Sequence, residues 1–504
     1  MSLSKNILAD VAEKENLCKP TEATLNLPEK VLQFGTGVLL RGLPDYYIDK
    51  ANKKGIFNGS IVIVKSTAQN KASDFDQQDN LYTVCVRGIE NGQKVNEHII
   101  NSSISRVLSA KEDWAEVVKC ASNKEMQVVI SNTTEVGISL DENDNLLAEV
   151  APNSFPGKLT KFLFHRFQHF NGAADAGMVI LPTELITDNG SKLKAICLEL
   201  ASINKMDAAF ITWLEEANDF CDTLVDRIVP GALRPHDIKQ TEEYLGYNDQ
   251  LMIMSEVYSL WAIETKSERT KEILSFAAAD KGIVVTENIE KFRNLKLRLL
   301  NGAHTFSCGL ALLSGFETVK EAMDNAYFER FINDLMVSEI TKTLVSESIR
   351  EEEAVQFSKS VLDRFRNPYI EHRWESISKQ YTAKMMMRNV PTLLAFYERF
   401  NKVPRHMALG FAAYLYFMRT EKTATGGYFR HSYGKQIAVE DNQAEVLNDH
   451  WNKISFEESI HEILADTNLW NADLTKLPGF EEAVMNNIRK LRTQTKLTHN
   501  TVIA

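Results

Sequence analysis

Residues 31–42 read VLQFGTGVLLRG, and this stretch decides the fold because an apolar run there meets two closely spaced glycines. Residues 31–34 predict a short strand, and a helical pattern opens after Gly37. In a dinucleotide-binding turn the first glycine permits a tight bend, and the second lets the backbone approach a pyrophosphate at the start of a helix. Gly35 and Gly37 fit these roles, although Leu40 occupies the place of the usual third glycine. An ordinary strand–helix turn is the alternative interpretation.

Four further apolar runs lie downstream of this turn, at residues 60–64, 126–130, 178–181 and 282–285. Each is short, rich in β-branched residues and nearly continuous in apolar residues, which is typical of parallel strands covered on both faces. Helical patterns separate several of the runs, for example at residues 111–121. This alternation predicts an α/β fold with a Rossmann-type doubly wound sheet.

The pattern changes after about residue 290, since no strand is predicted from there to the end. The predicted helices cover residues 295–313, 318–344, 408–419, 456–465 and 481–491. Residues 423–436 contain three glycines among mixed polar residues and predict a loop. We therefore expect residues 1–289 to form the Rossmann-type domain and residues 290–504 to form a mostly α-helical C-terminal domain.

Composition and charge narrow the class of protein. The chain has 504 residues, more than the ~50–250 residues of a usual domain, so two large domains are expected. Its 57 Lys and Arg residues against 68 Asp and Glu residues give a net charge of −11, which argues against a nucleic-acid partner. No stretch reaches the ~18 apolar residues of a membrane span, and the N-terminal residues do not resemble a signal peptide. Six cysteines without a CxxC pair fit free thiols in a reducing cytoplasm.

The first three strands end in candidates for cofactor binding. An acid that binds ribose is expected about 20 residues after the glycine turn, but the second strand ends in Lys65 and Ser66. These two residues could favour a 2′-phosphate and hence NADP, or Lys65 is solvated at a strand end. The loop after the third strand could contact ribose or nicotinamide, or it could cap a helix. The candidates are Phe34, Gly35, Thr36, Gly37, Val38, Leu39, Arg41, Lys65, Asn132, Thr133, Thr134 and Glu135.

The segment from Lys296 to His304, KLRLLNGAH, combines residue types that suit catalysis at a carbonyl or hydroxyl group. A lysine with a lowered pKa can act as a general base, and Asn301 and His304 can donate hydrogen bonds to a developing alkoxide. In an α-helix, however, Asn301 and His304 lie about 140° and about 80° around the axis from Lys296, so the three do not form one stripe. A surface lysine and a core histidine are the alternatives.

Together these motifs resemble the long-chain mannitol dehydrogenase family of polyol and sugar-acid oxidoreductases. The resemblance extends from Gln33 to Pro478 and rests on several ordered motifs at similar spacing. They are QFGTG at residues 33–37 with Arg41, SNTTE at residues 131–135 with Gly137, ELI at residues 184–186 with Asn189 and Gly190, TLVDRIV at residues 223–229, residues 296–304, and RFRNPYI at residues 364–370 with His372.

The resemblance implies NAD as the cofactor, no metal, and an active site in the cleft between a Rossmann-type and a helical domain. It implies that Lys296 is the general acid/base and that Asn301 and His304 hold the reacting oxygen. The missing acid after the second strand leaves the choice of NAD over NADP resting on the resemblance alone. Asp226 and Arg227 match a substrate-side and structural motif of the family.

One departure concerns Glu184 and Leu185, because polyol-oxidising members of the family carry Asp and Asn at these places. In those members the Asn helps to stabilise the alkoxide, and the side chain of Leu185 cannot donate a hydrogen bond in its stead. The Glu-Leu-Ile version resembles the sugar-acid branch of the family, with Glu184 on the substrate side.

A small sugar-acid substrate carries a carboxylate, which requires basic side chains nearby. The candidates are Arg364, Arg366, His372, Arg373, Lys384 and Arg388, and we expect Arg364, His372, Lys384 and Arg388 to bind the substrate. Lys384 and Arg388 are four residues apart and could share one helix face. A solvated basic surface is the alternative for each. Another ketouronate or a polyol is the alternative substrate, and a dinucleotide-binding sensor without activity is the alternative function.

Overall fold

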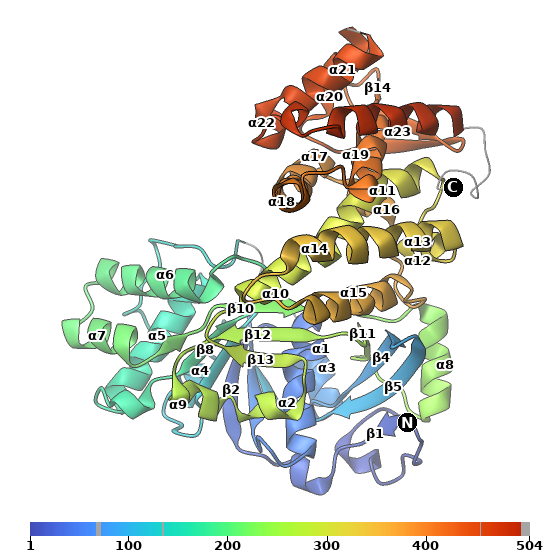
Figure 1. The fold of residues 1–504 in the computed structure, drawn as a ribbon. Helices are drawn as coiled ribbons and strands as arrows, with labels where there is room; N and C mark the ends of the chain where they lie inside the picture. Colours follow the sequence, from blue (N-terminus) through green and yellow to red (C-terminus); the bar gives the residue numbers. More distant parts are fainter. Residues whose placement is uncertain (67–71, 134–135, 454, 495–504) are drawn as a thin grey trace. The chain divides into compact units, whose positions relative to one another are not determined.

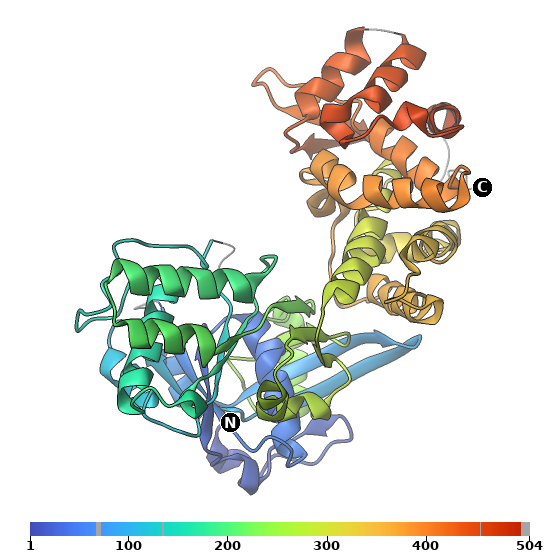
Figure 2. The ribbon, with the colours of Figure 1, turned by 60° about the vertical axis from the view of Figure 1, so that its left-hand side comes forward.

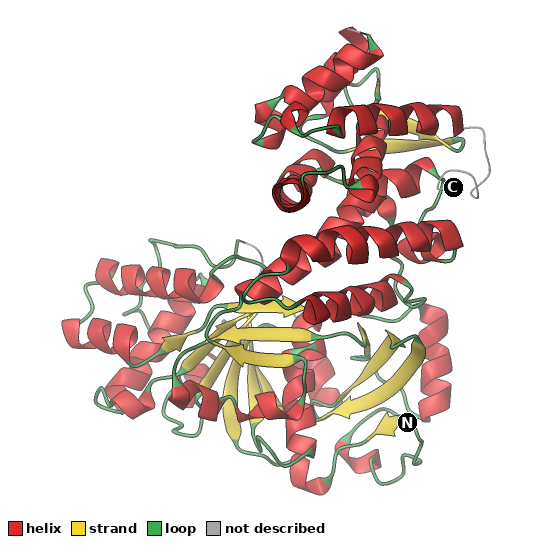
Figure 3. Ribbon diagram, in the orientation of Figure 1, coloured by secondary structure: helices red, strands yellow, loops and turns green. Residues whose placement is uncertain are grey.

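The computed structural model describes residues 1–66, 72–133, 136–453 and 455–494 (Figure 1). The chain divides into two compact units. Unit 1 consists of Met1–Gly88 and Lys94–Ile289, and unit 2 consists of Ile89–Gln93 and Glu290–Ala504. Figure 3 shows that unit 1 contains most of the strands, whereas unit 2 is almost entirely helical.

A six-stranded parallel sheet forms the centre of unit 1. In spatial order its strands are β6 (Ile104–Ser109), β3 (Ser60–Lys65), β2 (Glu29–Phe34), β7 (Val128–Ser131), β8 (Val179–Pro182) and β9 (Asp219–Phe220). Counted along the chain this is the order 3-2-1-4-5-6 of dinucleotide-binding doubly wound folds. The predicted doubly wound sheet is therefore confirmed.

Alternate residues of these strands pack into two cores on opposite faces of the sheet. Leu32 of β2 and Val129 of β7 are buried in one core, and their neighbours Val31 and Val128 are buried in the other. The first face is covered by α4 (Trp114–Cys120), α5 (Phe155–His169), α6 (Asn189–Ile203) and α7 (Ala208–Glu216). The green helices α6 and α7 lie side by side in Figure 2. Burial on both faces explains why the central parts of β2, β3, β7 and β8 are nearly continuous in apolar residues.

Two smaller sheets complete unit 1. One has the order β1 (Leu17–Cys18), β5 (Gln93–Asn101), β4 (Tyr82–Glu90) and β11 (Ile253–Glu256). The other has the order β10 (Thr223–Asp226), β12 (Leu260–Glu264) and β13 (Ile283–Thr286). The apolar run at residues 282–285 therefore forms a strand outside the central sheet, because β13 pairs with β12. Apolar continuity indicates that a strand is buried, but it does not select the strand's partner.

Among the remaining helices of unit 1, α2 covers the second face of the central sheet with its residues from Tyr46 to Ala51. They are α1 (Val38–Gly42), α2 (Pro44–Lys53), α3 (Ala72–Gln77), α8 (Pro235–Leu245) and α9 (Glu268–Ile273), with the 3₁₀ turns η1 (Lys5–Ile7), η2 (Glu22–Thr24), η3 (Ala174–Ala176) and η4 (Ser275–Ala279).

Unit 2 packs its helices around one large apolar core, as the helical periodicity predicts. Its α-helices are α10 (Glu290–Leu295), α11 (Ala303–Leu313), α12 (Val319–Met323), α13 (Ala326–Asp334), α14 (Thr341–Leu344), α15 (Glu351–Phe365), α16 (Trp374–Ser378), α17 (Tyr381–Lys384), α18 (Val390–Phe400), α19 (Arg405–Phe417), α20 (Ala444–Lys453), α21 (Phe456–Ala465), α22 (Thr467–Trp470) and α23 (Phe480–Gln494). The others are the π-helical segments η5 (Lys296–Gly302), η6 (Leu335–Ile340) and η7 (Met385–Asn389) and the 3₁₀ turn η8 (Leu474–Lys476). None of the helices in the described ranges has the length and apolarity that a membrane-spanning helix requires.

The prediction of a loop at residues 423–436 is wrong. Strands β14 (Glu421–Lys422), β15 (Tyr428–Ser432) and β16 (Lys435–Val439) form a small antiparallel sheet there. The turn from β15 to β16 has positive φ at both Tyr433 (48°) and Gly434 (74°), which suits a tight hairpin. Only Ile437 and Val439 of this sheet are buried, so the sequence lacks the longer apolar alternation that would reveal the strands.

Helices α11 and α19 approach each other closely at two glycines. A Cβ atom at Gly309 would lie 2.8 Å from the backbone of Ala413, and one at Gly410 would lie 2.6 Å from the carbonyl oxygen of Phe306. Both positions therefore require glycine, since larger residues would force the helices apart. The close contact fixes the position of α11, which carries His304, within unit 2.

Candidate active site

The glycine turn lies where the order of the central sheet reverses, at the carboxyl ends of β2 and its neighbours β3 and β7. The N–H group of Gly35 donates to the carbonyl oxygen of Val64 at 3.0 Å, and that of Asn132 donates to the carbonyl oxygen of Phe34 at 3.2 Å. These bonds join the ends of three strands. In open α/β sheets ligands bind outside the carboxyl ends of the strands at such a reversal.

Gly35 and Gly37 serve different purposes in this turn. Gly35 has φ of 124°, and a Cβ atom there would lie 2.9 Å from Cδ1 of Leu40 and 3.1 Å from the carbonyl oxygen of Asn132. Only glycine fits that backbone without strain. A Cβ atom at Gly37 would meet no heavy atom within 4 Å, so open space adjoins the backbone where a phosphate group could approach.

A cavity of about 530 Å³ opens beside this turn in unit 1. Six of the residues predicted to bind the cofactor line it: Phe34, Gly35, Thr36, Gly37, Asn132 and Thr133. Four others do not line it: Val38, Leu39, Arg41 and Lys65. The remaining two, Thr134 and Glu135, lie outside the described residues. The cavity offers a glycine backbone, hydroxyl groups and an amide, which fit the phosphates and ribose of a dinucleotide.

Several lining residues were missed by sequence reasoning, among them Ser66, Asn153, Ser154 and Lys158. Ser154 caps α5, because its hydroxyl accepts a hydrogen bond from the N–H group of Gly157 at 2.9 Å. The ammonium group of Lys158 donates to the carbonyl oxygens of Asn153 and Ser154, and burial lowers the pKa of this lysine. A serine cap before a Pro-Gly pair was the available signal for the start of α5.

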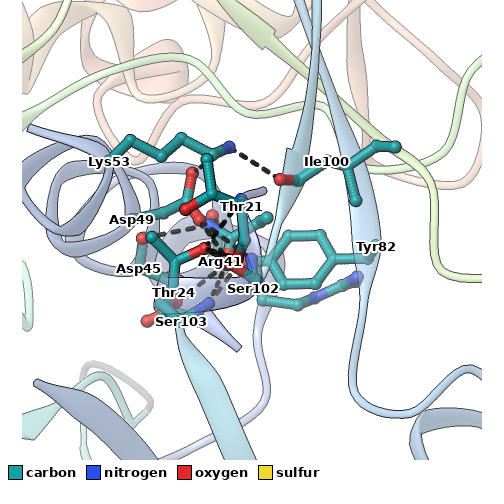
Figure 4. A network of polar contacts seen from close by, with 11 residues as sticks. Thr21, Thr24, Arg41, Asp45, Asp49, Lys53, Tyr82, Ile100, Ser102 and Ser103 are labelled. Atoms are coloured by element: carbon teal, nitrogen blue, oxygen red, sulfur yellow. Dashed lines mark hydrogen bonds and ion pairs between the residues drawn. The ribbon is translucent and has the colours of Figure 1, made fainter. Parts of the chain in front are cut away.

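Arg41 belongs to a largely buried polar network of unit 1 (Figure 4). Its guanidinium donates to the carbonyl oxygen of Leu251 at 2.7 Å, and the hydroxyl of Tyr82 donates to the carbonyl oxygen of Arg41 at 3.0 Å. The same network contains Asp49, which pairs with Lys53 at 2.7 Å. Arg41 therefore connects α1 to neighbouring strands within unit 1.

Asp45 is the most deeply buried acid of this network, with no exposed surface. Its Oδ2 accepts hydrogen bonds from Nε2 of Gln33 at 3.4 Å and from the hydroxyl of Tyr82 at 3.5 Å. Burial raises the pKa of Asp45 to about 7, although the hydrogen bond from Gln33 and the charge of Arg41 oppose that rise. Gln33 also donates to the carbonyl oxygen of Gly35 at 3.4 Å, so the network reaches the glycine turn.

Lys65 and Glu184 are both buried beside the strand ends. The side chain of Lys65 is 6% exposed, so it is not solvated at the strand end. The carboxylate of Glu184 accepts hydrogen bonds from the N–H group of Thr133 at 2.8 Å and from the hydroxyl of Ser131 at 3.1 Å. Glu184 thus holds the loop that carries Asn132 and Thr133, while the next residue, Leu185, is 64% exposed.

Asp226 and Arg227 are both 6% exposed and lie at the end of β10. The guanidinium of Arg227 donates to the carbonyl oxygens of Gly42 at 2.6 Å and of Glu256 at 2.9 Å. It also lies over the ring of Tyr46, 4.3 Å from its centre. These contacts hold α1 and α2 against β11 of the four-stranded sheet of unit 1.

In unit 2, Lys296 begins the π-helical segment η5, and His304 lies in the first turn of α11. A π-helix is closed by hydrogen bonds between residues five apart, whereas an α-helix is closed by bonds between residues four apart. Asn301 is five residues after Lys296, so it lies one π-turn along the same face. The wider turn therefore removes the separation that α-helical geometry predicts for these two residues, and π-helical segments are frequent at functional sites.

His304 is buried, with 7% of its surface exposed, and its ring stacks on Phe365 with centres 4.0 Å apart. The ring of His372 lies edge-on to it at 4.8 Å. Burial lowers the pKa of His304 well below its ordinary value, and the nearby His372, Arg364 and Arg388 lower it further. His304 is therefore neutral at pH 7.

The two ring nitrogens of His304 have different surroundings. The backbone of Leu300 partly opposes this fall of the pKa. Nε2 is buried without a hydrogen-bond partner in the described part of unit 2. A neutral imidazole carries one N–H group, so Nε2 can pair with a hydroxyl group of a ligand, which can both donate and accept a hydrogen bond.

The predicted cations fall into two groups. Arg366 pairs with Glu329 and Asp363, and Arg373 pairs with Glu371 and Glu317, so acids balance both. The other four are Arg364, His372, Lys384 and Arg388, and they gather around His304. Burial followed by the charges of Arg364 and Lys384 lowers the pKa of His372, and burial followed by the charge of Arg388 lowers the pKa of Lys384.

The π-helical segment η7 brings Arg388 against the start of α11. Nη1 of Arg388 lies 3.3 Å from the hydroxyl oxygen of Thr305, to which it donates. Arg298 of η5 in turn donates to the carbonyl oxygen of Arg388 at 2.6 Å. The two π-helical segments are thus joined directly, and they place Lys296, Asn301, His304 and Arg388 in one region of unit 2.

Both parts of the sequence match known domain families. Residues 29–274 match the mannitol dehydrogenase Rossmann domain, and residues 288–492 match the mannitol dehydrogenase C-terminal domain. The chain is 38% identical to an altronate oxidoreductase of Bacillus subtilis (strain 168) over 474 residues, which cover 93% of this chain and 95% of that protein. It is 35% identical to an altronate oxidoreductase of Escherichia coli O7:K1 over 470 residues, covering 92% and 94% of the two chains.

Two solved structures share the fold along the whole chain. A D-sorbitol dehydrogenase in substrate-free form superposes with a TM-score of 0.78 at 19% identity, with 100% of each chain covered. A Pseudomonas fluorescens mannitol 2-dehydrogenase, solved as a ternary complex with NAD and D-mannitol, superposes with a TM-score of 0.65 at 20% identity, covering 100% of this chain and 99% of that one.

Proposed function

Because this chain belongs to the mannitol dehydrogenase family, we propose that it is an NAD-dependent oxidoreductase that interconverts D-tagaturonate and D-altronate. Relatives named altronate oxidoreductase, 34–38% identical over most of the chain, support this choice of substrate. Unit 1 would bind the cofactor and unit 2 the sugar acid. The reaction would serve hexuronate catabolism in the cytoplasm, where six free thiols fit a reducing environment.

The observation that carries the proposal is the group of cations around His304. Arg364, His372, Lys384 and Arg388 lie in the same region of unit 2 as the lysine of the π-helical segment. Buried or half-buried basic groups that disfavour one another's charged forms are costly for the folded protein, and a bound anion would offset that cost. The carboxylate of a uronate supplies such an anion, whereas a neutral polyol does not.

Residues of this chain would manage the proton in the reaction. In reduction, the ammonium group of Lys296 gives a proton to the ketone oxygen while the side-chain amide of Asn301 donates a hydrogen bond to that oxygen. In oxidation, neutral Lys296 removes the proton of the altronate hydroxyl. Nε2 of neutral His304 accepts a hydrogen bond from a neighbouring hydroxyl group of the sugar and so orients the substrate.

The cavity beside Gly37 has the features that a dinucleotide needs. When bound, the nicotinamide supplies the hydride to the ketone carbon or accepts it from the alcohol carbon. The glycine backbone at residues 35–37 would accommodate the pyrophosphate, and Asn132 and Thr133 would contact the ribose or the nicotinamide. NAD is the proposed cofactor because a structural relative was solved with NAD.

An absorbance assay with NADH or NADPH and with tagaturonate, fructuronate or fructose tests cofactor and substrate together. The fastest turnover is expected with NADH and tagaturonate. Faster reduction of fructuronate would make the protein a fructuronate reductase, and faster reduction of fructose would make it a mannitol-type dehydrogenase. No oxidation of NADH with any ketouronate would leave a dinucleotide-binding sensor as the better interpretation.

A further inference from the structure

A second cavity, of about 490 Å³, lies in unit 2 among α13, α19 and α23. Among the described residues that line it there is none of the side chains proposed above for the reaction. Its floor is apolar, with Phe331 and Leu491 almost completely buried, at 2% and 4% exposure. A separate cavity with a formed floor has room for a ligand other than the sugar acid or the dinucleotide.

Three helices each contribute one cation to the wall of this cavity. They are Arg330 of α13, Arg405 at the first position of α19, and Lys490 of α23. All three side chains are exposed, and none has an ion pair or hydrogen bond with another described residue. In contrast, many surface cations of unit 2 are paired, for example Arg366 with Glu329 and Lys320 with Asp324.

The acids near the cavity are already engaged. Glu339 accepts hydrogen bonds from the N–H groups of His406 and Met407, each at 2.8 Å, and thereby caps the start of α19. Its Oε1 also lies 2.9 Å from Nδ1 of His406. Asp334 lines the wall and lies 3.9 Å from Nε2 of the same histidine. With Asp334 as the only acid among the described lining residues, the three cations leave an excess of positive charge.

We propose that this cavity binds an organic anion with at least two negative charges, a phosphate ester or a polycarboxylate. Arg330, Arg405 and Lys490 would hold the charged groups from three sides. Asn486 and Asn487, which also line the wall, would contact hydroxyl or carbonyl groups of the ligand. The N–H groups at the start of α19 are occupied by Glu339, so the side chains are the donors.

Isothermal titration with pyrophosphate and with citrate, at constant ionic strength and without sugar substrate, tests the proposal on the full chain. We expect saturable binding of at least one probe at one site per chain. Each of Arg330→Gln, Arg405→Gln and Lys490→Gln should weaken that binding about threefold to fivefold, as befits cations in partial contact with water. The triple variant should show no saturable heat, while its thermal unfolding and its turnover of the sugar acid match those of the wild type.

Two matched variants separate this cavity from other anion sites. Lys359→Gln removes an exposed cation of α15 that does not line the cavity, and it should leave probe binding unchanged. Arg388→Gln removes a cation beside His304, and it should also leave probe binding unchanged. Loss of binding in Arg388→Gln but not in Arg405→Gln would place the anion beside His304 and overturn the proposal. Absence of saturable binding by both probes in the wild type would overturn it as well.

Discussion

Each unit of the protein buries a cluster of charged side chains, and the two clusters differ in how their charge is balanced. The network of unit 1 contains both signs, since Asp45 lies near Arg41 and Asp49 pairs with Lys53 at 2.7 Å. The cluster around His304 in unit 2 is cationic, and its members lower one another's pKa values. A balanced cluster needs no further counter-charge in the folded protein, whereas a cluster of one sign favours the binding of an opposite charge.

The most severe test of the unit 2 cluster removes Lys296, the proposed proton carrier. Lys296→Ala should lower kcat for tagaturonate reduction about a thousandfold, because general acid–base catalysis contributes about 10²–10⁴-fold. Lys291→Ala removes a lysine of the preceding helix, which pairs with Glu353 at 3.4 Å, and it should leave kcat unchanged. Stopped-flow or steady-state NADH absorbance measures both. A Lys296→Ala protein with wild-type circular dichroism and near-normal kcat would refute the role of this lysine.

Removal of one cation from the cluster around His304 tests whether the positive charge of this cluster binds the substrate carboxylate. Arg388→Gln should lower kcat/KM for tagaturonate about a hundredfold, since the substrate carboxylate would lose a buried charged partner. Arg366→Gln is the matched control, because Glu329 and Asp363 already balance Arg366 and its loss should leave kcat/KM unchanged. Arg388→Gln should also raise the Tm slightly, because it removes repulsion among buried cations. An equal loss of kcat/KM in both variants would show that the acids paired with Arg366 do not make its role different from that of Arg388.

The pH dependence of the free energy of unfolding of the protein tests the balanced cluster of unit 1. Burial raises the pKa of Asp45 from 3.8 to about 7, so the folded protein holds a proton that the unfolded chain releases between these values. Stability therefore falls as the pH rises from about 4 to about 7. Asp45→Asn keeps the shape and removes this loss, so it should raise the free energy of unfolding by about 2 kcal/mol at pH 8 and by less at pH 5.

Denaturant titrations at both pH values measure this effect, with Asp49→Asn as the contrast. Asp49 pairs with Lys53 and accepts a hydrogen bond from the N–H group of Ser102 at 2.9 Å, so its substitution should destabilise the protein at pH 8. A lower stability of Asp45→Asn at pH 8 would show that Asp45 is ionised and fully compensated in the folded protein.

The smallest expected effects distinguish the two glycines of the turn. Gly37→Ala places a methyl group in open space, so the Tm should stay unchanged while the Kd of NADH rises about tenfold through contact with the pyrophosphate. Gly35→Ala strains a backbone with φ of 124° and should lower the Tm as well. Thermal unfolding and fluorescence titration with NADH provide the two measurements. An unchanged Kd in Gly37→Ala would mean that the pyrophosphate does not approach this backbone.

The fold of unit 1 could be predicted because burial on both faces of a parallel sheet leaves a strong signal. The strands at Val31, Val62 and Val129 contain nearly continuous apolar runs, and each is followed by turn or helix residues. The small sheet of β14–β16 gave no such signal, since only Ile437 and Val439 of β16 are buried. Strand patterns are visible in a sequence only where a face is covered.

It was easier to predict which residues lie at the candidate site than to predict where their side chains point. Gly35, Gly37, Asn132 and Thr133 line the cavity at the sheet reversal because strand ends converge there. The direction of Arg41 could not be predicted, because it depends on the carbonyl oxygen of Leu251, 210 residues later in the chain. The balance of Arg366 by Glu329 is likewise a tertiary contact that spacing along one helix does not reveal.

The π-helical segment at Lys296 has a consequence for how this protein can change in evolution. A π-turn contains about one residue more than an α-turn, so deletion of one residue between Lys296 and Asn301 would yield an ordinary α-helix. That helix would keep its hydrogen bonds and its caps, but it would turn Lys296 by about 100° relative to α11. Insertions and deletions in surface loops are usually harmless, whereas in η5 the number of residues determines how Lys296 is oriented relative to α11.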